Sequence, residues 1–433
     1  MRWCRRFAVA ALILCMPLGA GAAVLDRRAL PFDEPVRQFY AARDWNMAWS
    51  GSAAAEADAR QAISVLSKAS AEGLDASRYT LAVTGNDPSF SDVAITGAVL
   101  NYMNDLALGR SELRAVDADV GLPSRSGNSA GQLEAALKSH RVAQMLAELA
   151  PKHAEYLALK AALPTAGERA PIIMANMERW RWLPSQFEDD RIMVNAANAE
   201  LDLWLGGKPI LHSRVVVGRP ATRTPILRAE GAGITFNPFW TIPKSIAAKE
   251  ILPKLKKNPA WLANHDMFLL DGPKDDPQGL RIDWRAVRTG TFPYQIRQNP
   301  GPRNPLGRIK LELPNRFDVY LHDTSSKGDF QKPKRQLSHG CVRVEKIQSL
   351  ATHILGADVT ATRKIAEAVG QRDTSYLELP RKVPIYLLYW TAIPHDGTVT
   401  FLEDSYGRDR RLIAAMHATS IRLASAETPC VRG

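Results

Sequence analysis

The spacing of apolar residues changes near Arg191, and this change divides the chain into two kinds of structure. From about Pro35 to Lys160, apolar side chains recur every three or four residues, the period of an amphipathic helix. After Arg191 the period is two, and Gly206-Gly207-Lys208 joins two such runs as a hairpin turn would. The sequence therefore predicts an α+β protein, with helices first and then a strand-rich domain, and not a parallel doubly wound sheet.

Individual patterns give more local predictions. A stripe over 59–69 followed by Gly73 predicts a helix and its end, and 172–182 reads as a further helix. Strands are expected at 192–195, 200–205, 209–217, 309–311, 317–321, 383–390 and 398–402. A lysine-rich helical insertion at 244–262 interrupts them, and its lysines either face solvent or form one wall of a cleft for an acidic ligand.

The N-terminal 23 residues read as a secretory signal. Arg2, Arg5 and Arg6 precede an apolar run, 8–16, that is too short to span a bilayer, and Ala20-Gly21-Ala22 fits a cleavage site. Lipid attachment at Cys15 and an uncleaved anchor are the alternatives, so membrane contact is expected only through this segment. The net charge of +11 suits an anionic partner, but no nucleic-acid motif is present.

Removal of the signal would leave two of the four cysteines, Cys341 and Cys430. In an oxidising compartment they could form one disulfide. The other reading is a catalytic Cys341 with Cys430 as a bystander near the C-terminus, which we prefer because two cysteines make no disulfide framework.

Cys341 lies in the stretch Ser338-His339-Gly340-Cys341-Val342-Arg343, and His322 precedes this stretch with fifteen residues between. A thiolate is the nucleophile in cysteine catalysis, and an ordinary thiol, with a pKa of about 8.5, needs a base or a positive neighbour to supply it. The pair therefore predicts a cysteine acyl-transfer site.

These residues, with the preceding stretch 297–308, resemble the L,D-transpeptidases of the YkuD family, whose signature is a His, a spacer of this length and Ser/Thr-His-Gly-Cys-X-Arg/Asn. The stretches 178–184, 236–243 and 388–392 resemble the larger YcbB-type branch. That resemblance implies a helical scaffold domain and a β-sandwich-like catalytic domain with a helical lid or capping insertion. The peptidoglycan-binding module of many members is not evident, because only the short stretch 163–170 stands in its place.

The expected limits are a signal peptide at 1–23, a scaffold domain at 24–165, a catalytic domain at 170–405 with the lid at 243–298, and a C-terminal helix and tail at 406–433.

The resemblance also implies a reaction. Cys341 would attack a peptidoglycan stem tetrapeptide and release its terminal D-amino acid, with His322 as the base, and an acceptor amine would resolve the thioester as a 3-3 or 1-3 cross-link. It implies no cofactor, acylation by carbapenem β-lactams, and an exported, periplasmic enzyme of a Gram-negative cell envelope.

Site roles follow from the same resemblance. The catalytic residues would be Cys341, His322, Asp323 and Gly340, and the substrate-binding residues Tyr320, Ser338, His339, Arg343, Trp240, Phe236 and Asn304. Asp323 would orient His322 through its backbone carbonyl or its carboxylate, and N–H groups around Gly340 and Cys341 would stabilise the oxyanion. His339 either shapes the loop or contacts substrate, and Arg343 binds a substrate carboxylate or forms a structural ion pair.

Three other functions stay open. His322, His339 and Cys341 could share a metal ion. No further metal-binding motif accompanies them, and we expect no metal site. The same thiol could pass the acyl group to water, as an L,D-carboxypeptidase. The chain could also be a non-catalytic wall-binding protein. The acceptor and the oligomeric state are not readable from the sequence.

Overall fold

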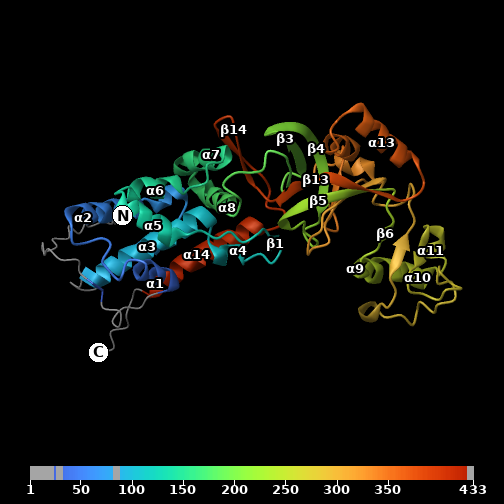
Figure 1. Cartoon of the computed structure of the whole chain (residues 1–433). Coiled ribbons are helices and arrows are strands. Elements are labelled where there is room, and N and C mark those ends of the chain that lie inside the picture. The colour runs from blue at the N-terminus through green and yellow to red at the C-terminus, as the bar shows by residue number, and fades with distance from the viewer. Residues whose placement is uncertain (1–23, 26–32, 81–87, 427–433) are drawn as a thin grey trace, which may run out of the picture. The chain divides into compact units, whose positions relative to one another are not determined.

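The computed structural model describes residues 24–25, 33–80 and 88–426, and its contacts divide the chain into two compact units (Figure 1). The first unit takes residues up to 114, then 125–185 and the part from 412 onward, whereas the second takes 115–124 and 186–411. The segment 115–124, which we call the strap, thus belongs to the second unit although both of its chain neighbours belong to the first. The expected signal peptide and Cys430 lie outside the described residues.

The first unit is built from helices, and those of its N-terminal part share an apolar core. Its helices are α1 (Glu34–Ala41), α2 (Ala53–Leu66), α3 (Pro88–Leu108), α4 (Ser111–Arg114), α5 (Ser129–Lys138), α6 (Val142–Glu148), α7 (Ala154–Ala162), α8 (Ala170–Arg181) and most of α14 (Arg408–Ala426). Phe39, Trp49, Val99 and Leu133 are among the buried residues of the core.

Local signals set the helix ends. The side chain of Ser52 accepts the Ala55 N–H and caps α2, as a hydroxyl does for the unpaired donors of a first turn. The stripe expected at 59–69 is α2 continued by a 3-10 turn, and Gly73 with a φ of 68° ends it, which confirms that prediction. The helix expected at 172–182 is α8. The stretch 163–170 consists of two 3-10 turns that lead from α7 into α8.

The largest sheet of the second unit is a mixed sheet. Its strands are β1 (Val120–Gly121), β2 (Arg191–Asn195), β3 (Glu200–Leu205), β4 (Lys208–Gly218), β5 (Ile226–Phe236), β9 (Ile309–Glu312), β10 (Leu321–His322), β11 (Gln336–Ser338), β12 (Val342–Val344) and β13 (Ser375–Leu388). The order is β1-β5-β13-β2-β3-β4-β12-β10-β9, with β11 beside β4.

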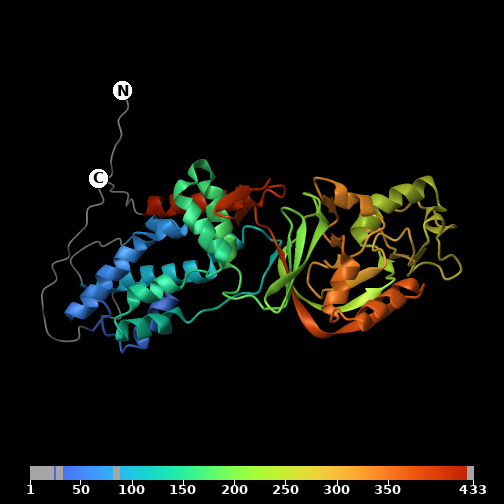
Figure 2. The same ribbon diagram turned by 90° about the horizontal axis from the view of Figure 1, so that it is seen from above.

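This sheet closes, because β9 pairs with β5 as well as with β10. A sandwich of two separate sheets would leave these edges open, so the expected β-sandwich is corrected to a barrel-like sheet within the same α+β class. Figure 2 shows its strands in a curved arrangement. In the closed sheet β10, which carries the expected base His322, lies between β9 and β12, and β12 directly follows the expected nucleophile Cys341.

Most strand predictions are confirmed, including the hairpin of β3 and β4 with Gly206 and Gly207 at positive φ. The strand expected at 317–321 is wrong over its first part. There the side chain of Asn315 accepts the N–H groups of Phe317 and Val319, and Asp318 has a φ of 52°, so the chain turns and only Leu321 and His322 pair.

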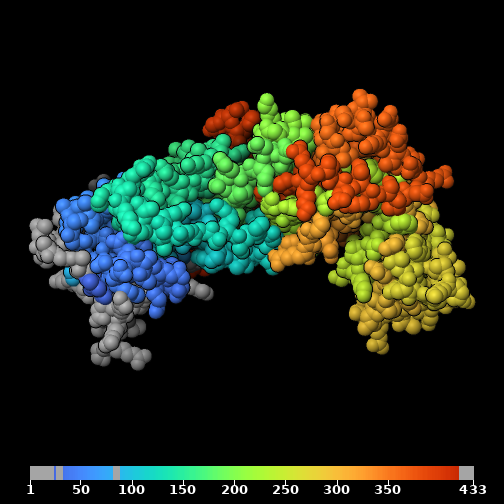
Figure 3. Space-filling model, viewed as in Figure 1, coloured from blue at the N-terminus to red at the C-terminus, as the bar shows by residue number. Residues whose placement is uncertain are grey.

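The insertion that we call the lid runs from Pro243 to Gln298. It contains α9 (Lys244–Ile246), a π-helical turn (Ala247–Ile251), α10 (Leu252–Lys257), α11 (Trp261–Asn264), β7 (Met267–Leu269) and β8 (Ile296–Gln298), and β8 pairs with β6 (Trp240–Thr241). The helices were expected, whereas the two strands were not. Ile251, Leu255 and Trp284 belong to a separate apolar core, and the lid residues form a lobe of their own in Figure 3.

The remaining elements are α12 (Ile347–Ile354), α13 (Val359–Gly370), and the hairpin of β14 (Ala392–His395) and β15 (Thr398–Phe401). Within the part of the chain that the structure describes, no helix combines the length and apolar character that a membrane crossing needs.

Candidate active site

Cys341 is the last residue of a tight loop, Ser338–Cys341, that joins β11 to β12. We call this segment the nucleophile loop. Gly340 adopts a φ of 126°, a conformation that residues with a Cβ rarely take, so the glycine of the motif is required by the backbone. Cys341 is a free thiol, half-buried, with its Sγ 3.7 Å from the carbonyl oxygen of Asp318.

Strand pairing brings Cys341 and His322 onto one face of the sheet. In the parallel pairing of β10 and β12, Leu321 lies opposite Val342 and His322 opposite Arg343, and the Val342 N–H donates to the Tyr320 carbonyl at 3.0 Å. Paired residues share a face and successive residues alternate, so Tyr320 and Cys341 belong to the face of His322. The ring centres of Tyr320 and His322 are 5.5 Å apart.

Burial keeps both partners uncharged at rest. It lowers the pKa of His322 to about 3, with Arg343 acting in the same direction and the backbone and charge of Asp323 opposing it. Burial also raises the pKa of the Cys341 thiol, against hydrogen bonds from Tyr320 and the charge of Lys310. The arrangement is therefore a neutral thiol and a neutral imidazole on one face of the sheet, which suits proton transfer during attack more than a preformed ion pair.

The Asp323 carboxylate is used elsewhere. It accepts the Arg308 N–H at 2.9 Å and pairs with the ammonium group of Lys327. Among the described residues no hydrogen-bond partner is assigned to Nδ1 of His322, which is buried. Of the two expected ways to orient His322, the carboxylate is thus already engaged with other groups, whereas the backbone of Asp323 still acts on the imidazole.

Ser338 holds the nucleophile loop from within. Its hydroxyl donates to the Cys341 carbonyl at 2.6 Å and accepts the Gly340 N–H at 3.0 Å. The Gly340 N–H, expected as an oxyanion donor, is therefore already engaged, which leaves the N–H of Cys341 as the candidate. Ser338 itself is buried and faces the loop.

His339 and Arg343, both expected to contact substrate, bind carboxylates of the protein itself. Nε2 of His339 lies 2.6 Å from Oε1 of Glu250 in the π-helical turn of the lid, and Arg219 approaches the same oxygen at 3.7 Å. Arg343 forms an ion pair with Asp329 at 2.9 Å. In this structure His339 thus connects the nucleophile loop to the lid, and Arg343 adopts the ion-pair alternative.

The other expected contacts lie at the base of the lid. Phe236 is buried at the end of β5, and Trp240 is half-buried on β6, where it packs on the lid core. Asn304 is buried, and its amide donates to the carbonyls of Pro238 and Asn299 at 3.0 and 3.1 Å. In this structure the Asn304 side chain thus holds the turn at 299–304 to the segment that precedes the lid.

Sequence reasoning missed Lys310, Glu250 and Thr224, which all contact the site. Lys310 lies opposite His322 in the β9–β10 pairing, and Thr224 bonds to the nucleophile loop. Glu250 could have been found, because it is an acidic residue within a lysine-rich helical segment. Lys310 and Thr224 have no such signal in the sequence, because a contact between separate strands or loops leaves no local sequence pattern.

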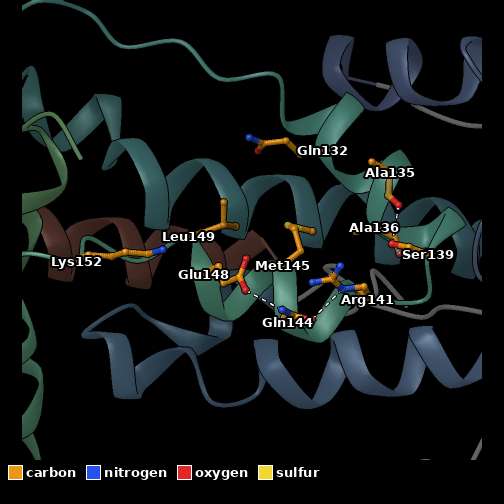
Figure 4. A pocket seen from close by; sticks show the side chains of 10 residues that line it. All are labelled: Gln132, Ala135, Ala136, Ser139, Arg141, Gln144, Met145, Glu148, Leu149 and Lys152. Atoms are coloured by element: carbon orange, nitrogen blue, oxygen red, sulfur yellow. Dashed lines mark hydrogen bonds between the residues drawn. The ribbon is translucent and has the colours of Figure 1, made fainter. Parts of the chain in front are cut away.

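The described residues contain no group of three or more His, Cys, Asp or Glu side chains placed to hold a metal ion. A cavity of about 440 Å³ lies in the first unit along α5 and α6 (Figure 4). Among its polar side chains, Gln144 is hydrogen-bonded to Arg141 and Glu148. None of the residues that line it belongs to the candidate active site.

Comparison with known proteins agrees with this geometry. A family model described as a scaffold domain matches residues 34–163, and one described as the L,D-transpeptidase catalytic domain (YkuD) matches residues 189–375. A Haemophilus influenzae protein named "Putative L,D-transpeptidase" is 30% identical over 399 residues, covering 88% of this chain and 80% of the relative.

Solved structures also match the chain, and two of them follow. An L,D-transpeptidase from Mycobacterium smegmatis has 12% identity and a TM-score of 0.23, covering 46% of this chain and 58% of its own. The structure of the Ldtfm-avibactam carbamoyl enzyme has 13% identity and a TM-score of 0.25, and the match covers 68% of this chain and 80% of that chain. TM-scores this low leave the assignment to the family models and the curated relative. By these matches the chain belongs to the L,D-transpeptidases, an enzyme family, with a YkuD catalytic domain and a scaffold domain.

Proposed function

We propose that this enzyme cross-links peptidoglycan stem peptides through a thioester on Cys341. The observation that carries the proposal is the placement of Cys341 and His322 on one face of two paired strands, with the thiol free and half-buried. Family membership supplies the substrate class, since L,D-transpeptidases act on peptidoglycan.

In the first step the Cys341 sulfur attacks the carbonyl carbon between the L-centre of the third residue and the terminal D-amino acid of a tetrapeptide. His322 accepts the thiol proton and delivers it to the departing amine, so the C–N bond breaks as the C–S bond forms. A buried, neutral His322 is competent to take that proton at neutral pH.

Negative charge develops on the carbonyl oxygen during this step. The peptide N–H of Cys341 is the donor that we assign to it, because the Gly340 N–H is bound to Ser338. Tyr320 is the second group at this position, since its side chain interacts with the Cys341 sulfur.

In the second step the amine of another stem peptide attacks the thioester carbonyl and gives a proton to His322. The new C–N bond forms as the C–S bond breaks, and His322 passes that proton to the departing sulfur. An acceptor amine on a third residue gives a 3-3 link. Water in place of the amine gives a trimmed tripeptide, so the L,D-carboxypeptidase alternative differs only in the acceptor.

The test is incubation of the purified protein with disaccharide-tetrapeptide and sequencing of the products by tandem mass spectrometry. Cross-linked dimers support the transpeptidase, trimmed monomers support the carboxypeptidase, and unchanged substrate favours a non-catalytic wall-binding protein. Cys341→Ala should abolish both products, and His322→Ala should slow them by about 10²–10⁴-fold, the usual contribution of a general base. Full activity in either variant contradicts the assignment.

A second readout is covalent labelling. A carbapenem should add its mass once, at Cys341, and Cys341→Ala should stay unlabelled. Export to the periplasm is part of the same proposal, because the substrate lies outside the cytoplasm. Mass analysis of the protein from a cell envelope should show an N-terminus near residue 24, whereas an intact residue 1 contradicts cleavage of the signal segment.

A further inference from the structure

We propose that the loop Gly218–Thr224, which we call the clamp loop, sets the direction of the Cys341 peptide, and that the hydroxyl of Thr224 is its central contact. The inference rests on the proposed function and deepens it. It names positioning residues outside the Ser-His-Gly-Cys motif that act through the nucleophile loop.

Thr224 joins the two loops through one hydroxyl group. Its Oγ1 donates to the Gly340 carbonyl at 2.7 Å and accepts the Gly218 N–H at 2.9 Å. The residue has no exposed surface, so water cannot replace either contact. Since a threonine hydroxyl has a single proton, that proton is committed to the Gly340 carbonyl.

The Gly340 carbonyl belongs to the same peptide group as the Cys341 N–H. In a planar trans peptide the C=O and N–H bonds point in opposite directions. Anchoring the carbonyl on Thr224 therefore turns the Cys341 N–H away from the clamp loop. This N–H is the oxyanion donor of the proposed mechanism, so its aim depends on Thr224.

A second set of hydrogen bonds holds the nucleophile loop two peptide groups earlier. The Ser338 carbonyl accepts the Thr222 hydroxyl at 3.0 Å and the Arg219 N–H at 2.9 Å. The two sets of hydrogen bonds fix the carbonyls that precede His339 and Cys341. Gly340 between them has its φ of 126° held from both sides.

The clamp loop is itself tightly folded. A Cβ on Gly218 would lie 2.1 Å from the Thr222 carbonyl oxygen and 2.7 Å from the Thr224 nitrogen, so only glycine fits. The buried Tyr406 hydroxyl donates to the Gly218 carbonyl at 2.6 Å.

The strap anchors the clamp loop from outside. Arg223 lies between the two threonines, and its Nε and Nη2 contact Oδ2 of Asp119 at 2.9 and 2.7 Å. Asp119 belongs to the strap, the segment of the second unit that interrupts the first in sequence. A contact path therefore runs from Asp119 through Arg223 and Thr224 to Gly340.

The experiment compares Thr224→Val with Thr224→Ser in the full chain. Valine keeps the shape but removes both hydrogen bonds. Acylation by a carbapenem, followed by intact-protein mass spectrometry, should slow by about 10²-fold, the usual effect of a small misplacement at a reacting centre. Alkylation by iodoacetamide needs no oxyanion donor and should stay near the wild-type rate. Thr224→Ser should restore acylation.

Thr96→Val in the first unit is the matched control. The Thr96 hydroxyl is equally buried and contacts Tyr40 and Trp49 at 2.7 and 2.8 Å. Its loss should lower the melting temperature without changing the acylation rate. Should Thr224→Val fail to fold, Thr222→Val and Asp119→Asn, both at half-buried positions, test the same path and should slow acylation by about tenfold, less than a central contact would.

The outcomes separate the two proposals. If the wild type is acylated and the clamp variants react equally fast, the clamp is wrong and the proposed function stands. An equal loss of acylation and alkylation also contradicts the clamp, because it means that the loop has collapsed. If the wild type is not acylated at all, the proposed function fails and the clamp fails with it.

Discussion

Lys310 lies directly opposite His322 in the antiparallel pairing of β9 and β10, and its Nζ is 4.3 Å from the centre of the Tyr320 ring. The same ammonium group pairs with Glu312 at 2.8 Å, which restrains it over the ring. Its charge lowers the pKa of the Cys341 thiol, against the larger effect of burial. Lys310 thus places a positive charge close to the nucleophile.

We expect Lys310→Met to raise the pH at which Cys341 is alkylated by iodoacetamide, because the thiolate loses a favourable charge while Asp318 and Tyr320 stay in place. The wild-type midpoint should itself lie above the usual value of about 8.5 for a thiol, because burial raises the pKa. Lys310→Arg keeps the charge and should keep the midpoint. An unchanged midpoint in Lys310→Met would show that the charge of Lys310 does not affect the pKa of the Cys341 thiol.

The burial of His322 predicts a loss of stability in acid. Its pKa falls from 6.5 to about 3 on folding, so between these values the unfolded chain binds a proton that the folded chain does not. The stabilisation by neutral His322 is therefore complete above pH 6.5 and is lost as the pH falls toward 3. Urea unfolding of His322→Gln at pH 7 and pH 4.5 should show a smaller decline than the wild type. His417→Gln, at an exposed site, is the control and should decline as the wild type does.

The contact of Glu250 with His339 predicts an effect of the lid on acylation. The pKa of the Glu250 carboxyl lies below its usual range, because His339 and the nearby Arg219 oppose its burial. A partly exposed ion pair contributes at most about 1 kcal/mol, so its loss can change a rate by up to about fivefold.

Glu250→Gln should speed acylation by a carbapenem severalfold, because the lid then leaves the nucleophile loop more readily. High salt should have a similar effect on the wild type and little on the variant. Asp275→Asn removes a different carboxylate of the lid, which is paired with Arg281, and should not change the rate. A slower Glu250→Gln would mean that this contact holds the site in its active form.

The nucleophile loop could be predicted from the sequence because its shape is set by neighbours. Gly340 and Ser338 act within three residues of Cys341, and the motif contains them all. The same holds for the hairpin at Gly206, where local turn chemistry fixes the register. The strand predicted at 317–321 failed because one side chain, Asn315, captured backbone donors that a periodic pattern assigns to a sheet.

Contacts between distant residues could not be predicted. The partner of Gly340 is Thr224 and the partner of His339 is Glu250, which lie 116 and 89 residues away in the chain. Closure of the sheet between β5 and β9 decides which strands face the site, and a period of two says nothing about it. Ser338 and Asn304 were expected to contact substrate, but both polar side chains satisfy nearby backbone groups.

The stability of the first unit should depend on a buried ion pair between Arg181 and Glu178. Both side chains have no exposed surface, and Nη1 and Oε2 are 2.9 Å apart. Arg181 also donates to the Tyr156 hydroxyl at 3.0 Å and to the Glu72 carbonyl. Removal of one partner leaves the other charge buried without compensation.

Arg181→Met should therefore lower the free energy of unfolding by about 3–5 kcal/mol. Glu178 also accepts the Arg110 N–H and the Trp182 indole N–H, so glutamine at 178 can retain a polar acceptor without a charge. The double variant Arg181→Met with Glu178→Gln should then recover part of the loss. Urea unfolding followed by tryptophan fluorescence measures both. If the single variant lost less than about 1 kcal/mol, or the double variant lost more than the single one, the uncompensated charge would not be the cause, because the double variant carries none.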